Sequence, residues 1–181
     1  VYSRDGLADV YAATEAGVAK GMAALRESRP RGGFLSHKGE RVTSEYLRWI
    51  VEAEMLRLGC LGQHTIVASG DQCVDPHDVG SGPIRPDTSI IFDVFPRHVA
   101  TGYYADMSRT VVRGRASKEL RGLWDAVLAG QRYGIDHVRA GCKGREIHEG
   151  IQALFSARGY RTGPRDGRME GFFHGTGHSL G

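Results

Sequence analysis

Two aspartates stand in segments that otherwise have the composition of β-strands. Asp93 lies within the apolar run IIFDVF at residues 90–95, and Asp106 lies within YYADMSRTVV at residues 103–112. Strands are depleted in aspartate, and a buried carboxylate is costly unless it is paired, protonated or bound to a metal. Because side chains alternate along a strand, Asp93 is predicted to share a face with its second neighbours and to be at least partly buried.

The two segments are predicted to pair as an antiparallel hairpin, so that the two carboxylates can face each other. Directly opposite side chains lie roughly 4.5–5.5 Å apart between their Cβ atoms, and two negative charges that close repel strongly. A divalent cation between two hard oxygen ligands removes the repulsion. The alternative is ion pairing, of Asp93 with Arg97 or Arg109 and of Asp106 with Arg109.

Three histidines add nitrogen donors to this set. His174 and His178 stand four residues apart in HGTGHSLG at residues 174–181, and the glycines between them exclude the helical HExxH zinc motif. Glycine lets the backbone pass close to a ligand, and histidine supplies a neutral metal ligand or a donor to a developing oxyanion. His77 stands on a loop before the first aspartate segment. The alternatives are a glycine-rich tail with incidental histidines and a solvated loop residue at 77.

The elements that carry these residues follow from hydrophobic periodicity. Spacings of three, four and seven predict helices over 5–27, 43–58, 117–140 and 144–157. Strand-like composition predicts strands over 64–69, 88–95 and 103–112. Polar loops are expected over 27–40 and 70–87, and irregular chain with one or two short strands over 160–181. This order predicts an α+β fold of two similar helix-helix-strand halves, the second of which stops early.

Composition and net charge argue against several classes of protein. The chain has 181 residues, with 24 lysines and arginines against 21 aspartates and glutamates, so its net charge of +3 is too mild to indicate a nucleic-acid or membrane partner. No apolar run reaches the roughly 20 residues of a membrane span. The three cysteines lack CxxC spacing, which argues against a disulfide framework and favours the reducing cytosol.

Together these motifs resemble the M24 metallopeptidases of the pita-bread fold, a group that includes methionine aminopeptidase, aminopeptidase P and prolidase. VASGDQCVDPH at residues 67–77 is similar to the segment of that family that ends in a substrate-binding histidine. IIFDVFP and YYADMSRTVV resemble the two strands that supply metal-binding aspartates, and HGTGHSLG resembles the HGxxHxxG segment of the proline-specific branch. The resemblance covers nearly the whole chain.

The resemblance implies a role for each candidate residue. Asp93 corresponds to a terminal metal ligand, Asp106 to a bridging ligand and His178 to a histidine ligand, whereas His77 and His174 correspond to catalytic residues that contact the substrate. The expected cofactors are two divalent ions, Mn²⁺, Co²⁺ or Zn²⁺, that activate a water. The expected reaction is removal of an N-terminal residue from Xaa-Pro peptides, by an Xaa-Pro aminopeptidase or dipeptidase.

Two departures from the family pattern qualify this expectation. The interval from Asp93 to Asp106 is a couple of residues longer than usual, and the family's remaining histidine and two glutamate ligands follow the HGxxHxxG segment. Residues 1–181 are therefore expected to be a partial catalytic domain, truncated at its C-terminus and inactive alone. A cytoplasmic homodimer that binds a peptide substrate is expected. The alternatives are a creatinase-like hydrolase that splits a non-peptide C–N bond without metal, and a non-catalytic binding module.

Overall fold

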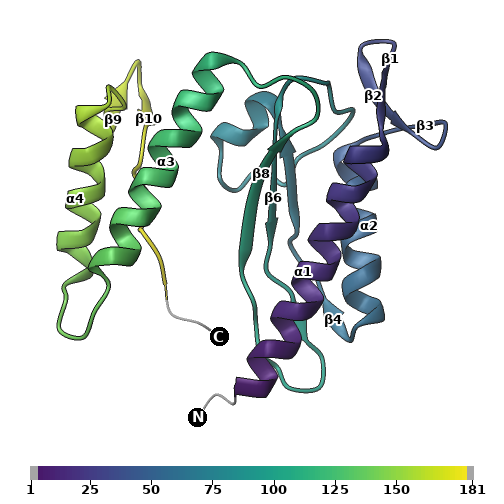
Figure 1. Cartoon of the computed structure of the whole chain (residues 1–181), viewed down its shortest axis with the longest axis horizontal. Helices are drawn as coiled ribbons and strands as arrows, with labels where there is room; N and C mark the ends of the chain where they lie inside the picture. The colour runs from purple at the N-terminus through teal and green to yellow at the C-terminus, as the bar shows by residue number, and fades with distance from the viewer. Residues whose placement is uncertain (1–3, 179–181) are drawn as a thin grey trace. The chain divides into compact units, whose positions relative to one another are not determined.

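The structure, a computed structural model, describes residues 4–178 and divides them into two compact units (Figure 1). The first unit runs to Ala116 and the second begins at Ser117. Each unit has its own buried apolar cluster. Each also has two helices followed by strands, with three short strands inserted between the helices of the first unit, so the predicted α+β fold of two similar halves is confirmed. Among the described residues, no helix is both long and apolar enough to cross a bilayer.

The first unit contains two long helices and a three-stranded antiparallel sheet. The helices are α1 (Arg4–Glu27) and α2 (Ser44–Arg57). The sheet has the order β5-β6-β8, formed by Ile66–Ser69, Ser89–Val94 and Met107–Val112. Both helices lie on one side of this sheet (Figure 1). A short pair joins β4 (Cys60–Leu61) to β7 (Arg97–His98), and a 3₁₀ helix, η1, spans Gly70–Val74.

Close packing of α1 fixes the central strand, β6. Ile90, Phe92 and Val94 point into the core of the unit and are fully buried. A Cβ atom added at Gly21 of α1 would lie 2.9 Å from the Phe92 ring and 2.9 Å from the Val51 side chain of α2. Helix and sheet therefore meet where α1 has no side chain. The alternate residues of β6, including Asp93, form the half-buried face of the strand.

The polar loop predicted over 27–40 is wrong, because this segment forms most of a second antiparallel sheet. Its strands are β1 (Arg29–Arg31), β2 (Phe34–His37) and β3 (Glu40–Arg41), in that order. Leu35 is fully buried, and its backbone N–H donates to the carbonyl of Ile84 at 2.9 Å. The burial of Leu35 and the two tight turns between the strands thus allow a largely polar sequence to form a sheet.

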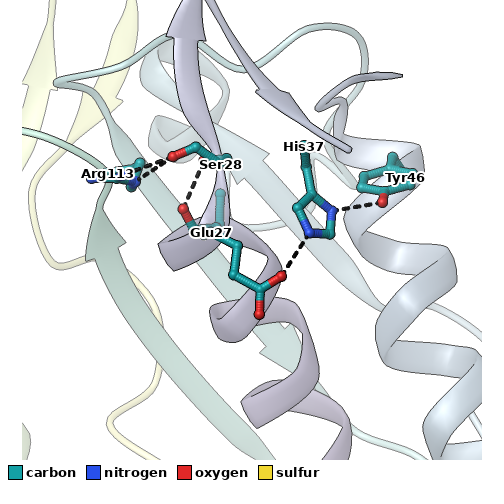
Figure 2. A network of polar contacts seen from close by, with 6 residues as sticks. Glu27, Ser28, His37, Tyr46 and Arg113 are labelled. Atoms are coloured by element: carbon teal, nitrogen blue, oxygen red, sulfur yellow. Dashed lines mark hydrogen bonds and ion pairs between the residues drawn. The ribbon is translucent and has the colours of Figure 1, made fainter. Parts of the chain in front are cut away.

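A polar network fastens this sheet to both helices (Figure 2). His37 is only 6% exposed; its Nδ1 lies 2.8 Å from the Tyr46 hydroxyl of α2, and its Nε2 lies 3.1 Å from Oε2 of Glu27 at the end of α1. The Arg113 guanidinium donates to the carbonyl of Ser28 at 2.7 Å. Buried polar groups with complete hydrogen bonding rigidify a structure, so the network holds β1, β2 and β3 firmly on the unit.

The Glu27–His37 contact predicts a pH-dependent contribution to stability. The hydrogen bond from His37 lowers the pKa of Glu27 below its ordinary value of 4.5. A carboxylate with a lowered pKa stabilises the fold above its unfolded-state pKa, and this contribution is lost as the pH falls through the folded-state pKa. Glu27→Gln is expected to lower the urea midpoint of the first unit at pH 7, and the difference from wild type should shrink below pH 4.5. A difference that is constant from pH 7 to pH 3 would contradict the assignment.

The second unit consists of a helix pair and a hairpin. α3 (Lys118–His137) and α4 (Gly144–Ala157) enclose a small cluster of Ala126, Ile147, Ile151 and Phe155. The hairpin joins β9 (Gly163–Arg165) to β10 (Arg168–Glu170). Ser117 caps α3 by accepting a hydrogen bond from the Leu120 N–H. α3 ends at His137, earlier than the predicted residue 140, because Val138 takes an extended backbone conformation.

Candidate metal centre

Asp93 occupies a half-buried position at the centre of the main sheet of the first unit. The Ser108 hydroxyl of β8 donates a 2.6 Å hydrogen bond to its Oδ1. Burial raises the pKa of the Asp93 carboxyl above its ordinary value; the Ser108 hydrogen bond opposes this rise, and the negative charge of Asp106 adds to it. Ionisation of Asp93 is therefore harder than that of a solvated aspartate, and a positive charge nearby would make it easier.

The two aspartates do not stand directly opposite each other, which corrects the sequence expectation. β8 begins at Met107 rather than at residue 103, so Asp106 lies just before the strand and is exposed. The register pairs Val94 with Met107 because both side chains are buried, and this places Ser108 opposite Asp93. Asp106 is two residues from Ser108, which makes it a diagonal neighbour of Asp93, and such neighbours are typically about 7–8 Å apart.

The surroundings of Asp93 fit a hard cation better than an arginine. Within residues 4–178, no arginine forms an ion pair with Asp93, and the Arg109 guanidinium instead donates to the Ser108 carbonyl at 2.8 Å. A desolvated carboxylate beside a second carboxylate is the kind of oxygen donor set that divalent ions accept. One aspartate alone supplies too few donors to hold a metal ion. Among the described residues, no group of three or more His, Cys, Asp or Glu side chains comes together as a metal site.

His77 lies in the same unit as the aspartates, as an exposed residue in a turn after η1. Its backbone N–H donates to Oδ1 of Asp75 at 2.9 Å, which fixes the turn. Three residues further on, Gly80 has a positive φ of 78° and a Cβ there would overlap the Val67 carbonyl, so the loop passes tightly against β5. The role predicted for His77 as a substrate contact remains a prediction.

His174 and His178 lie in the second unit, in an exposed irregular segment that follows β10. The last three residues of the HGTGHSLG motif, 179–181, lie outside the described residues. Both histidines border an apolar groove of about 1130 Å³ between α3, α4 and residues 172–178. Val127 and Ile135 of α3 and Ile151 and Phe155 of α4 line it. The metal-ligand role of His178 and the substrate role of His174 stay predictions.

One face of α4 anchors the segment that carries these histidines. A 2.9 Å hydrogen bond joins His148 Nδ1 to Thr176 Oγ1, and the His148 ring stacks on Phe172 with centroids 5.0 Å apart. Gln152, one turn later, donates to the Phe172 carbonyl at 3.0 Å, and Phe155 meets the Phe172 ring edge-on. Sequence reasoning missed His148. Its spacing of four and seven residues from Gln152 and Phe155 was the available signal.

The Thr176 hydroxyl is expected to hold the histidine segment in place. Thr176→Val keeps the shape of the side chain but removes a hydrogen bond worth about 0.5–1.5 kcal/mol. We expect the ¹⁵N heteronuclear NOE values of Gly175 and Gly177 to fall in this variant. Thr176→Ser should retain the wild-type values, and Glu149→Gln, on the same helix, is the matched control. Equal NOE values in the Val and Ser variants would show that the hydroxyl has no anchoring role.

The comparisons with known proteins identify the family. The model of metallopeptidase family M24 matches residues 5–181, and the chain belongs to this family. Xaa-Pro aminopeptidase 1 of Streptomyces coelicolor is 32% identical over 133 residues, which cover 67% of this chain and 27% of that protein. Xaa-Pro dipeptidase of Lactobacillus delbrueckii is 28% identical over 118 residues, which cover 65% of this chain and 29% of that protein.

Solved structures confirm the predicted fold. The Xaa-Pro dipeptidase from Bacillus anthracis matches all of this chain with a TM-score of 0.76 and 25% identity. The pita-bread fold expected from the motifs is therefore the fold of this chain. The chain spans 46% of that dipeptidase and about 30% of the curated relatives that it matches.

Proposed function

We propose that this chain is part of a metal-dependent exopeptidase that acts on Xaa-Pro peptides, as an Xaa-Pro aminopeptidase or dipeptidase. The observation that carries the proposal is the half-buried Asp93 carboxylate on β6, with Asp106 as its diagonal neighbour across the β6–β8 pair. Membership of family M24 and relatives named Xaa-Pro aminopeptidase and Xaa-Pro dipeptidase support the substrate class.

In this proposal Asp93, Asp106 and His178 hold the metal, and ligands outside these 181 residues complete the set. Two bound divalent ions would supply Lewis acidity and a water that is easier to deprotonate. The Ser108 hydroxyl orients Asp93 through its 2.6 Å hydrogen bond, as outer-shell partners of metal ligands commonly do. A bound cation would favour the ionised form of Asp93 and so oppose the burial that raises its pKa.

His77 and His174 are proposed to bind the substrate. Each imidazole is exposed and so accessible to a peptide. A donor nitrogen on either ring can hold the scissile carbonyl oxygen as negative charge develops on it. Mn²⁺, Co²⁺ or Zn²⁺ as the metal, a homodimer and a cytoplasmic location belong to the same proposal.

Turnover of Xaa-Pro peptides by the full-length protein tests the function. We expect hydrolysis of an Xaa-Pro dipeptide or a longer Xaa-Pro peptide in the presence of Mn²⁺ or Co²⁺, loss of activity with a chelator and recovery when the metal is restored. Xaa-Ala peptides of the same length are the matched control. Chelator-resistant hydrolysis would indicate a creatinase-like C–N hydrolase instead. A protein that binds no stoichiometric metal and cleaves neither peptide would indicate a non-catalytic module.

A further inference from the structure

One face of the β1-β2-β3 sheet gathers arginines in a regular array. The register places Arg29 and Arg41 on either side of Ser36, and it places Arg31 opposite Phe34. Paired residues of an antiparallel sheet point to the same face, and so do alternate residues of one strand. All five side chains therefore share a face, whereas Leu35 and His37 occupy the buried face.

A fourth arginine joins this array through the Phe34 ring. The Arg41 guanidinium carbon lies 4.9 Å from the ring centroid and that of Arg85 lies 5.6 Å from it. Each cation is attracted to the π-face, but two like charges over one ring repel each other. We name this face, made of Arg29, Arg31, Arg41, Arg85, Phe34 and Ser36, the arginine face.

The charge of the arginine face is not neutralised by its own surroundings. Each of its four arginines is exposed, and none forms an ion pair with a carboxylate within residues 4–178. The nearby acidic residues Glu27 and Glu40 do not belong to the arginine face. Glu27 contacts His37, and Glu40 is the register partner of His37, which occupies the opposite face of the sheet. The His37 network also holds the sheet rigidly on the helices (Figure 2), so the arginines are displayed on a fixed scaffold.

The edge of β1 limits how a partner can bind. The N–H and C=O of Leu35 point away from β1, toward Ile84 and Val42, so its register partner Pro30 directs its own backbone to the free edge. Proline has no N–H to offer there. A partner therefore does not add as a full strand and is recognised by side-chain charge.

We propose that the arginine face binds an acidic segment of another polypeptide, one with carboxylates at alternate positions. Arg29 and Arg31 are two residues apart on a strand, about 7 Å, which is the spacing of alternate side chains in an extended peptide. The guanidinium group holds carboxylates by paired hydrogen bonds. A nucleic acid fits less well, because the face spans only three short strands and two guanidiniums already occupy the Phe34 ring.

Fluorescence anisotropy with the 181-residue chain tests this proposal. The probe is a fluorescein-labelled eight-residue peptide of alternating glutamate and serine. A labelled oligothymidylate of eight nucleotides, measured in the same way, represents nucleic acid as the alternative ligand. We expect saturable binding of the peptide that weakens as NaCl rises from about 50 to about 500 mM, because salt screens exposed charges. The double variant Arg29→Ser/Arg41→Ser should bind it on the order of 10-fold more weakly.

The charge-matched control is Arg132→Ser/Arg168→Ser, which removes two exposed arginines from the second unit and should keep wild-type affinity. Arg41→Lys keeps the charge but loses the planar fork, so a loss of roughly half the double-variant effect is expected. Chemical-shift changes on residues 29–41 of the wild type provide a readout that does not depend on any variant folding. Equal loss in both double variants, no shift changes on 29–41, or tighter binding of the oligonucleotide would each overturn the proposal.

Discussion

Turnover of Xaa-Pro peptides by the full-length protein is expected to fall by at least ~100-fold when Asp106 is replaced by alanine. Changes to groups that merely support a metal ligand already cost about 10–100-fold in affinity or activity, and loss of a side chain proposed to bind the metal itself should cost more. Removal of Asp106 also removes a charge that raises the pKa of Asp93, so loss of the metal rather than loss of Asp93 ionisation is the expected cause. Metal content by mass spectrometry should fall together with turnover.

Ser108→Ala is a second variant, expected to lower turnover less than Asp106→Ala does. It leaves both aspartates but removes the 2.6 Å hydrogen bond to Asp93, so a loss of about 10–100-fold is expected, with partial recovery at high metal concentration. Arg109→Ala, one residue further along β8, is the matched control, because its guanidinium contacts the Ser108 carbonyl and not Asp93. Unchanged turnover and metal content in Asp106→Ala would remove Asp106 from the metal site.

The helices could be predicted from the sequence because all four show hydrophobic periodicity and two of them also carry a capping hydroxyl. Thr43 and Ser117 have the hydroxyl that an N-cap needs, and in both cases the hydroxyl accepts a hydrogen bond from a backbone N–H of the first turn. The span 144–157 was predicted to the residue. The strands β1, β2 and β3 were missed because what stabilises them is distant: Leu35 is buried against Ile84, almost fifty residues further along the chain.

In the candidate site too, the features set by local pattern could be predicted from the sequence, and those set by tertiary contacts could not. The face of Asp93 follows from alternation along one strand, and the structure confirms it. The position of Asp106 depends on where β8 begins, and the residues just before β8 contact the segment after β6: Tyr104 forms a bridge with Arg97, and the Ala105 N–H donates to the Pro96 carbonyl. The anchoring of residues 172–176 by α4 is likewise a tertiary contact, although the residues on that helix face share helical spacing.

Phe92→Ala is expected to destabilise the first unit by about 3–5 kcal/mol, the usual cost of deleting a large buried aromatic ring. Phe92 has no exposed surface and is among the largest of the fully buried side chains. Urea unfolding followed by the backbone NMR signals of β5 and β6 measures the first unit separately. Ile91→Ala is the matched control, because Ile91 is the half-buried neighbour on the opposite face, and about 1 kcal/mol is expected there.

A double-mutant cycle with Gly21 separates the loss of the ring from general damage to the strand that carries Asp93. Gly21→Ala alone places a methyl group 2.9 Å from the Phe92 ring and from Val51, and overpacking of this kind costs about 1–3 kcal/mol. In the Phe92→Ala background the ring contact is gone, so the added methyl group partly fills the cavity and keeps only its Val51 contact. The two changes should therefore be less destabilising together than their sum, because residues in contact are not additive. Strict additivity would show that α1 does not meet β6 at Gly21.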